Sequence, residues 1–231
     1  MAAVPLEPAF VLHRRRYGDT SLLLELLTRD QGRLAAVAKG AAQARRGKAG
    51  LLQPFAPLLV VCRGRGEVVT LTAVEAAARP HVLPGRQLYC GLYLNELLLQ
   101  LLARHDPHPE VFANYALALA ELSDATPPDG PLRRFELKLL EALGFGLQLT
   151  CEADGVTPVD PARRYHYRVD AGPVATEQGD GFAGITLLDL ARGEMHSPVA
   201  RTEARRLMRE VLHHHLEGRP LRSRELFRAD R

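Results

Sequence analysis

The chain lacks acidic residues over one long stretch. No Asp or Glu occurs between Gln31 and Gly66, whereas seven basic residues do: Arg33, Lys39, Arg45, Arg46, Lys48, Arg63 and Arg65. Residues 1–80 hold twelve Lys and Arg against six Asp and Glu, and residues 81–231 hold eighteen against twenty-one. This asymmetry indicates a polyanionic partner for the first part, usually nucleic acid or an anionic membrane, and the alternative is a solubilising charged face.

Other features that are scarce exclude further classes of protein. No apolar run approaches the roughly eighteen residues of a membrane-spanning helix, and the first ten residues, MAAVPLEPAF, lack the basic and then apolar order of a secretory signal. Cys62, Cys90 and Cys151 lie far apart, which is typical of a reducing compartment rather than of a disulfide framework. We therefore expect a cytoplasmic protein with no membrane partner.

Catalytic and metal-binding motifs are also missing from the sequence. It contains no HExxH, GxSxG or phosphate-loop motif, and the isolated acids of the first half offer no two-metal nuclease centre. His213, His214 and His215 are adjacent, so on a helix they would point about 100° apart and could not converge on one ion. We expect no enzymatic activity, no catalytic residues, no cofactor and no bound metal.

Five stretches in the first eighty residues have the pattern of β-strands with turns between them. They are AFVLHRR, TSLLLELL, RLAAVAK, PLLVVCR and EVVTLTAVE. Five antiparallel strands in a partly open Greek key form an OB-fold, which often binds single strands. The sequence therefore predicts an α+β protein whose residues 1–80 form a basic OB-fold barrel.

The basic residues of this barrel are concentrated near predicted strand ends. Arg14 and Arg16 are two positions apart and so share one face of a strand. Aromatic residues that could stack on bases are few, namely Phe10, Tyr17 and Phe55, so contact with a phosphate chain would be mostly electrostatic and tolerant of base sequence. The candidate set for such a groove is Arg14, Arg16, Arg33, Lys39, Arg45, Arg46, Lys48, Arg63 and Arg65.

After Pro80 the pattern changes to the three- and four-residue spacing of helices. Helices are predicted over GRQLYCGLYLNELLLQLLARH, PEVFANYALALAELSD and PLRRFELKLLEALG, and a last one opens at Ser197-Pro198. Residues 146–196 lose this spacing and are rich in Gly, Pro and Asp, apart from a β-like piece at RYHYRV. Residues 81–231 are thus predicted to form an all-helical domain with an irregular insertion.

Five blocks of this sequence resemble, in order and spacing, the bacterial RecO family of DNA-repair proteins. They are AFVLHRRRYGDTSLLLELLTRDQGRLAAVAKGA, LLQPFAPLLVVCRGRGEVVTL, GLYLNELLLQLL, LRRFELKLLEALGFG and GRPLRSRELF. The resemblance spans nearly the whole chain and implies an N-terminal OB-fold, a helical C-terminal domain and a place in the bacterial cytoplasm, associated with the nucleoid. It also implies binding of single- and double-stranded DNA, with the basic residues above as the DNA-binding set, and annealing of complementary strands. The implied partners are RecR and, indirectly, RecA, which is loaded on DNA coated by the single-stranded-DNA-binding protein (SSB).

The chain departs from many members of this family at the insertion. Those members carry two Cys pairs that bind zinc after the LGxG block, whereas this segment holds Cys151 alone, so four thiolates are not available. The chain resembles the zinc-free members. We expect apolar contacts to hold the insertion, from Tyr165, Tyr167, Val169 and Val174.

The resemblance also implies a docking place for the C-terminal tail of SSB in the block LRRFELKLLEALGFG. Arg133 would meet the terminal carboxylate of the tail, and Phe135 and Leu139 would form an apolar wall. In the alternative, Phe135 and Leu139 are core residues at helical spacing and Arg133 is a solvated residue near the start of the helix.

Two other classes of function remain open from the residues. An OB-fold RNA-binding or translation-associated module would need the same basic groove as a DNA-binding protein. A nuclease would cut DNA with magnesium, although the sequence offers no cluster of carboxylates for it.

Overall fold

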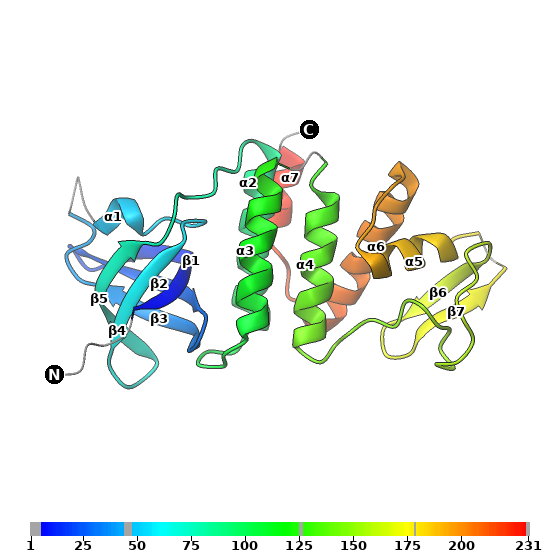
Figure 1. Cartoon of the computed structure of the whole chain (residues 1–231), viewed down its shortest axis with the longest axis horizontal. Helices are drawn as coiled ribbons and strands as arrows, with labels where there is room; N and C mark the ends of the chain where they lie inside the picture. The colour runs from blue at the N-terminus through cyan, green and yellow to red at the C-terminus, as the bar shows by residue number, and fades with distance from the viewer. Residues whose placement is uncertain (1–5, 44–47, 125–126, 178, 230–231) are drawn as a thin grey trace. The chain divides into compact units, whose positions relative to one another are not determined.

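The computed structural model describes residues 6–43, 48–124, 127–177 and 179–229 (Figure 1). By compactness the chain divides into unit 1, which is residues 1–123 with 221–231, and unit 2, which is residues 124–220. In the described part of the chain, no helix combines the length and the apolar character needed to cross a membrane.

Unit 1 contains a closed five-stranded barrel in the order β1-β2-β3-β5-β4. Its strands are β1 (Glu7–Tyr17), β2 (Ser21–Thr28), β3 (Gly32–Ala38), β4 (Leu58–Arg63) and β5 (Val68–Ala76). Neighbouring strands are antiparallel except for β3 and β5. The predicted N-terminal OB-fold barrel is confirmed.

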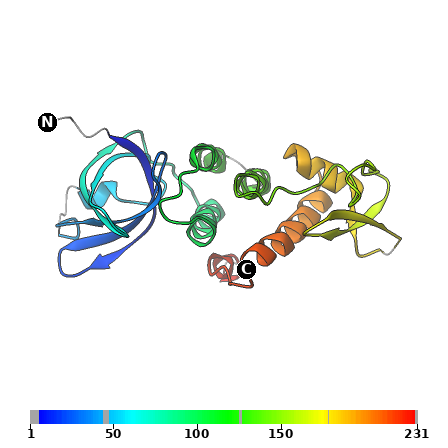
Figure 2. The ribbon, with the colours of Figure 1, turned by 90° about the horizontal axis from the view of Figure 1, so that it is seen from below.

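The inside of the barrel is filled by side chains that alternate along the strands. Leu22, Leu24 and Leu26 belong to the buried cluster that also contains Val11 and Val60. Because the side-chain period of a strand is two, these positions share the inner face. Helix α1 (Lys48–Leu51) lies at the mouth of the barrel, which Figure 2 views nearly along its axis.

Helices α2 (Arg86–Leu101) and α3 (Pro109–Asp124) lie against the outer face of β1. Asn95 Nδ2 on α2 donates to the carbonyl of Leu12 at 2.9 Å, and the Phe10 ring centroid lies 5.1 Å from that of Tyr115 on α3. Both helices were predicted. Their side chains cover Phe10 and Leu12 but leave the end of β1, from His13 to Tyr17, half-buried or exposed.

The short helix α7 (Ser223–Ala229) completes unit 1 and was not predicted. Glu96 on α2 accepts hydrogen bonds from the backbone N–H groups of Arg222 and Ser223, each at 2.8 Å. A carboxylate at this end satisfies amides that have no partner within the helix and complements the helix dipole.

Unit 2 consists of α4 (Asp129–Ala142), a three-stranded antiparallel sheet and two further helices. The sheet has the order β7-β6-β8, from β6 (Arg164–Arg168), β7 (Gly172–Thr176) and β8 (Phe182–Ala183). Helices α5 (Gly184–Arg192) and α6 (Pro198–His215) follow. The predicted cap of α6 is confirmed, since Ser197 Oγ accepts from the N–H of Ala200 at 3.0 Å.

Strand β6 is the β-like piece predicted at RYHYRV, whereas β7, β8 and α5 correct the expectation that the rest of residues 146–196 is irregular. Their glycines mark close approaches of the backbone rather than a lack of structure, because a Cβ on Gly184 would lie 2.0 Å from the carbonyl oxygen of Asp160. Of the four residues expected to hold the insertion, Tyr165 is buried, Tyr167 and Val169 are half-buried, and Val174 is exposed.

Candidate nucleic-acid interface

Positive charge is concentrated in unit 1. Unit 1 contains eighteen Lys and Arg against twelve Asp and Glu, whereas unit 2 contains twelve against fifteen. A folded unit with this excess of positive charge attracts polyanions over distances of about a Debye length, roughly 8–10 Å in physiological salt. The barrel of unit 1 is therefore the candidate interface.

Arg14 and Arg16 lie on the side of β1 that continues the inner face of the barrel. They are opposite Leu24 and Leu22 in the antiparallel pairing of β1 with β2, and both leucines belong to the barrel core. Arg14 Nη1 donates to the carbonyls of Ala49 and Leu52, each at 3.3 Å, so this side chain holds α1 at the barrel mouth. Arg16 is exposed.

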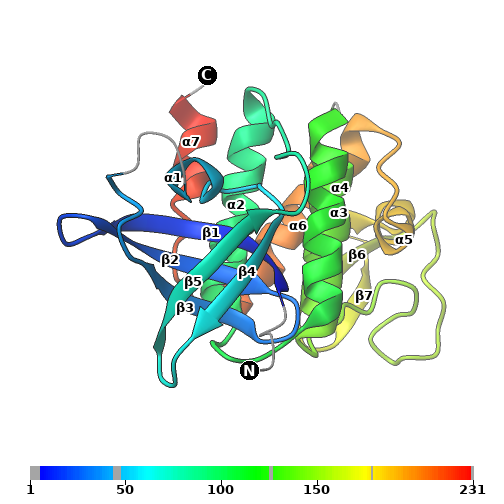
Figure 3. The same ribbon diagram turned by 60° about the vertical axis from the view of Figure 1, so that its left-hand side comes forward.

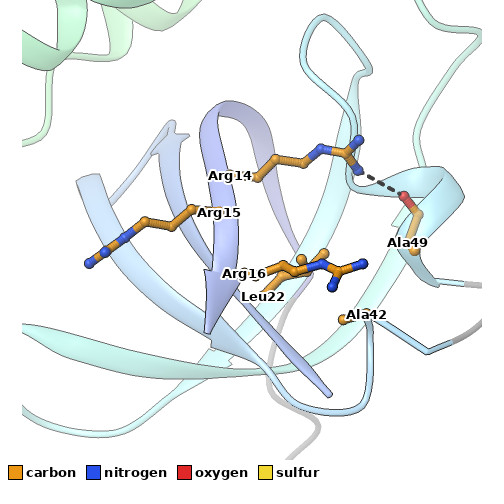
Figure 4. Close-up of a pocket in the computed structure, with 6 residues that line it drawn as sticks. All are labelled: Arg14, Arg15, Arg16, Leu22, Ala42 and Ala49. Atoms are coloured by element: carbon orange, nitrogen blue, oxygen red, sulfur yellow. Dashed lines mark hydrogen bonds between the residues drawn. The ribbon is translucent and has the colours of Figure 1, made fainter. Parts of the chain in front are cut away.

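A hollow of about 300 Å³ lies beside these side chains (Figure 4). It is lined by Arg14, Arg15, Arg16, Leu22, Ala42 and Ala49. Figure 4 shows Arg15 pointing to the other side of β1 from Arg14 and Arg16, as expected from the alternation of a strand. The predicted pair is therefore on one face, and the arginine between them is on the opposite one.

That opposite face carries a row of residues across all five strands. Arg15, Leu23, Val37, Thr70 and Arg63 are successive pairing partners. Leu23, Val37 and Thr70 are half-buried, and the arginines at both ends are exposed. Directly opposed residues share a face, so the row runs over the outer surface and covers roughly 19 Å at about 4.8 Å per strand.

The two hairpins at the ends of this row project from the barrel in different directions (Figure 3). The β1–β2 turn follows Arg15, and the β4–β5 turn follows Arg63 and contains the exposed Arg65. The two arginine pairs proposed from the sequence to meet at strand ends thus lie at opposite ends of this row. Strands β1 and β4 also pair directly, but through Glu7–Ala9, at the other end of β1. Lys39 directly follows β3, which lies between β1 and β4 in the strand order, and its side chain is exposed.

Arg33 has an internal place in unit 1. Its side chain is only 16% exposed, lies 3.9 Å from a carboxylate oxygen of Glu25 and donates to the carbonyl of Leu99. Burial lowers the pKa of Arg33 and the nearby Arg104 lowers it further, while Glu25 acts in the opposite direction. The expectation that Arg33 faces a phosphate chain is corrected, because its guanidinium is used to join β2, β3 and the end of α2.

Three residues of the predicted basic loop cannot be placed. Arg45 and Arg46 lie outside the described residues, and so does the side chain of Lys48 at the start of α1. Their proposed contact with phosphates stays a prediction.

The predicted docking residues for the SSB tail are buried in the structure. Phe135 and Leu139 are 2% and 1% exposed, and the Arg133 side chain pairs with Glu136 at 2.7 Å. The alternative interpretation is correct in that Phe135 and Leu139 are core residues. It is wrong in that Arg133 is buried and not solvated. The three side chains do not form an exposed surface, so the structure does not support them as a docking place.

No group of three His, Cys, Asp or Glu side chains within the described ranges is arranged to hold a metal ion. The His215 ring stacks on Phe145 with centroids 4.3 Å apart, while His214 Nε2 lies 3.6 Å from a carboxylate oxygen of Asp170. These neighbouring histidines thus face different partners.

The fold defines the class of the protein as an OB-like barrel followed by a helical region. The family model described as "Recombination protein O N terminal" matches residues 1–79, and "Recombination protein O C terminal" matches residues 85–225. The chain is 51% identical over 227 residues to the "DNA repair protein RecO" of Methylococcus capsulatus, covering 98% of this chain and 94% of that protein. It is also 48% identical over 234 residues to the protein of that name in Halorhodospira halophila, covering 96% of each chain. The chain belongs to the RecO family of DNA-repair proteins.

Proposed function

We propose that this protein is a non-catalytic recombination mediator that binds DNA through unit 1. It holds single- and double-stranded DNA, anneals complementary strands, and acts with RecR to load RecA on single strands coated by SSB. Family membership supports the setting in DNA repair, and the named partners rest on the family resemblance alone. For this activity the protein must be in the bacterial cytoplasm, associated with the nucleoid.

The observation that carries the DNA-binding proposal is the outer row that begins at Arg15 and ends at Arg63. OB-folds bind oligonucleotides over the face of strands 2 and 3 and through the loops that join strands 1 to 2 and 4 to 5. Both of these loops border an arginine at an end of the row, and Lys39 follows the third strand. A single strand laid along the row would place phosphates near positive charge at both ends and in the middle.

Such contacts give affinity without base specificity. Arg and Lys bound to phosphates release counterions from the DNA, so affinity falls as salt rises, and they carry no information about base sequence. A protein that must anneal any pair of complementary strands needs this kind of binding. OB-folds cover about 4–16 nucleotides each, which agrees with a row of roughly 19 Å extended by the two loops.

The proposal is tested by annealing of complementary oligonucleotides that are coated with SSB. Wild-type protein is expected to speed annealing without a nucleotide, and the outer-face variant Arg15→Ala/Lys39→Ala/Arg63→Ala to do so much less. The matched control, Arg168→Ala/Arg192→Ala/Arg209→Ala, removes the same charge from exposed residues of unit 2 and should anneal like wild type.

Three results would overturn the proposal. Equal annealing by wild type and the outer-face variant would exclude the row as the DNA path. Absent annealing together with much tighter binding of RNA than of DNA would indicate a translation-associated module. Magnesium-dependent cleavage of the oligonucleotides would indicate a nuclease.

A further inference from the structure

Tyr17 is an aromatic side chain left in solvent at the tip of the β1–β2 hairpin. Tyr17 is 55% exposed, while the other two aromatics of the barrel, Phe10 and Phe55, are buried. No residue in the described part of the chain makes a hydrogen bond or a ring contact with the Tyr17 side chain. Among the described residues, the hairpin thus presents an aromatic ring that no hydrogen bond or ring contact engages.

The position of Tyr17 connects it with the outer row. Tyr17 is the last residue of β1 and pairs with Ser21, so it lies two positions beyond Arg15. Alternate residues of a strand share a face, which places Tyr17 and Arg15 together on the outer side. Leu23 and Val37, half-buried on the neighbouring strands, provide an apolar floor next to them.

Charges at the tip favour a base over a phosphate as the ligand of Tyr17. The turn continues with Gly18 and the exposed Asp19, whose carboxylate repels phosphates from the tip itself. Arg15 and Arg16, just before the tip, attract them. A strand whose phosphates lie near these arginines can turn its bases toward the tyrosine ring.

We propose that Tyr17 stacks on an unpaired base of single-stranded DNA and gives the barrel a preference for unpaired strands. This inference rests on the proposed function and names a DNA base as the group that Tyr17 of the barrel binds. Stacking on an aromatic ring contributes to the binding of single strands whatever the base, since every base has a π-face. In a continuous duplex the bases are stacked on each other and must be unstacked before a side chain can reach them, so Tyr17 contributes little there.

The test compares two DNA molecules without ends, a single-stranded circle and a relaxed duplex circle. Tyr17→Ala is expected to weaken binding to the single-stranded circle by roughly five- to 150-fold, the scale of one lost base–aromatic stack. Binding to the duplex circle should change less than about twofold, because the arginines that meet phosphates remain. Tyr17→Phe keeps the ring and should bind both molecules like wild type.

A spectroscopic variant reports stacking directly. The chain has no tryptophan, so Tyr17→Trp introduces a single indole whose fluorescence should be quenched by the single-stranded circle and not by the duplex circle. Val156→Trp places the indole at an exposed residue of unit 2 and should show no such quenching. Because Tyr17 is exposed, melting temperatures of all variants should equal that of wild type.

The salt dependence separates this role from that of a phosphate contact. Tyr17→Ala should leave the slope of log affinity against log salt unchanged, whereas Arg15→Ala should flatten it by about 0.7 on single strands. Equal loss of affinity for both circles, or unquenched fluorescence at saturation, would overturn the stacking role while leaving DNA binding intact. If wild-type protein bound neither circle, the proposed function and this inference would both be wrong.

Discussion

Arg133 and Glu136, one turn apart on α4, form an ion pair with Nη2 of the arginine 2.7 Å from Oε1 of the glutamate. Their side chains are 7% and 0% exposed. Removing one member of a buried ion pair is strongly destabilising, because the other charge stays buried after the ion pair is lost. Arg133 therefore belongs to the fold rather than to a surface that receives a peptide carboxylate.

Arg133→Ala should lower the free energy of unfolding by about 3–5 kcal/mol, because it removes a 2.7 Å ion pair with a carboxylate that stays fully buried. Urea unfolding followed by circular dichroism measures this. The matched control is Lys138→Ala, which removes an exposed pair on the same helix, 2.7 Å from Glu141, and should cost less than about 1 kcal/mol. Wild-type stability of Arg133→Ala together with lost binding of an SSB tail peptide would restore the docking interpretation.

Glu203 on α6 joins three parts of unit 2. Its carboxylate accepts hydrogen bonds from the backbone N–H of Ala183 at 2.9 Å, from Thr186 Oγ1 at 2.8 Å and from Arg164 Nη2 at 2.9 Å. Burial would raise the pKa of Glu203, but these hydrogen bonds together outweigh it and hold the pKa below its ordinary value. The ionised carboxylate is thus the form that stabilises the sheet and α5.

Glu203→Gln should lower the free energy of unfolding by about 1.5–3 kcal/mol at neutral pH, the scale of hydrogen bonds to a charged group. Since the pKa in the folded state is lowered, the contribution is present in full above the unfolded value near 4.5 and is lost as the pH falls through the folded value. The difference in free energy of unfolding between wild type and Glu203→Gln should therefore be constant above about pH 4.5 and become smaller below it. Urea unfolding at a series of pH values checks this, with the exposed Glu210→Gln as a control on the same helix. If this difference in free energy became larger toward acid pH, the ionised form of Glu203 would not be the one that stabilises unit 2.

Purified protein should contain no stoichiometric zinc, and a chelator should leave its melting temperature unchanged. Cys151 is the sole thiol of residues 146–196, so a tetrahedral thiolate site cannot be assembled there. The same segment is held by Tyr165, which is buried and accepts from the N–H of Asp160 at 2.8 Å, and by the Glu203 contacts. One equivalent of zinc in elemental analysis, or a chelator-dependent loss of stability, would show that another ligand set binds the metal.

The elements that could be predicted from the sequence are those whose pattern is local. Alternation of Leu22, Leu24 and Leu26 indicates a half-buried strand, and Ser197-Pro198 indicates a helix start. Helix α7 depends instead on Glu96, 127 residues away from Ser223, and no local pattern contains that contact. Helix α5 begins at Gly184 without a side-chain cap, so its start has no sequence signal.

The candidate site was predicted in part, for a similar reason. Spacing alone grouped Arg14 with Arg16, but the register of β1 with β2 is needed to see that this pair continues the inner face and that Arg15 belongs to the outer one. Arg33 has the sequence context of a surface residue, and its partners Glu25 and Leu99 come from other elements. Exposure of a charged side chain is decided by such tertiary contacts, which a one-dimensional pattern does not contain.

The path of the phosphates can be measured through the salt dependence of binding to single-stranded oligonucleotides. The slope of log affinity against log salt includes roughly −0.7 for each phosphate that a basic residue neutralises. Replacing Arg45, Arg46 and Lys48 by Ala should flatten the slope by about 2, and so should replacing Arg15, Lys39 and Arg63. Both changes should weaken binding to all sequences alike, since phosphate contacts carry no base information.

The control for this comparison is the triple replacement of Arg168, Arg192 and Arg209 in unit 2, which removes equal charge and should leave the slope unchanged. Circular dichroism checks that each variant is folded. A flattened slope for both variants means that the loop of Arg45, Arg46 and Lys48 and the outer face of Arg15, Lys39 and Arg63 both contact the phosphates. An unchanged slope for the Arg45, Arg46 and Lys48 variant would make that loop a solvated charged face, and the DNA would then run over the outer row alone. An unchanged slope for the outer-row variant would exclude the row, because three lost phosphate contacts cannot leave counterion release the same.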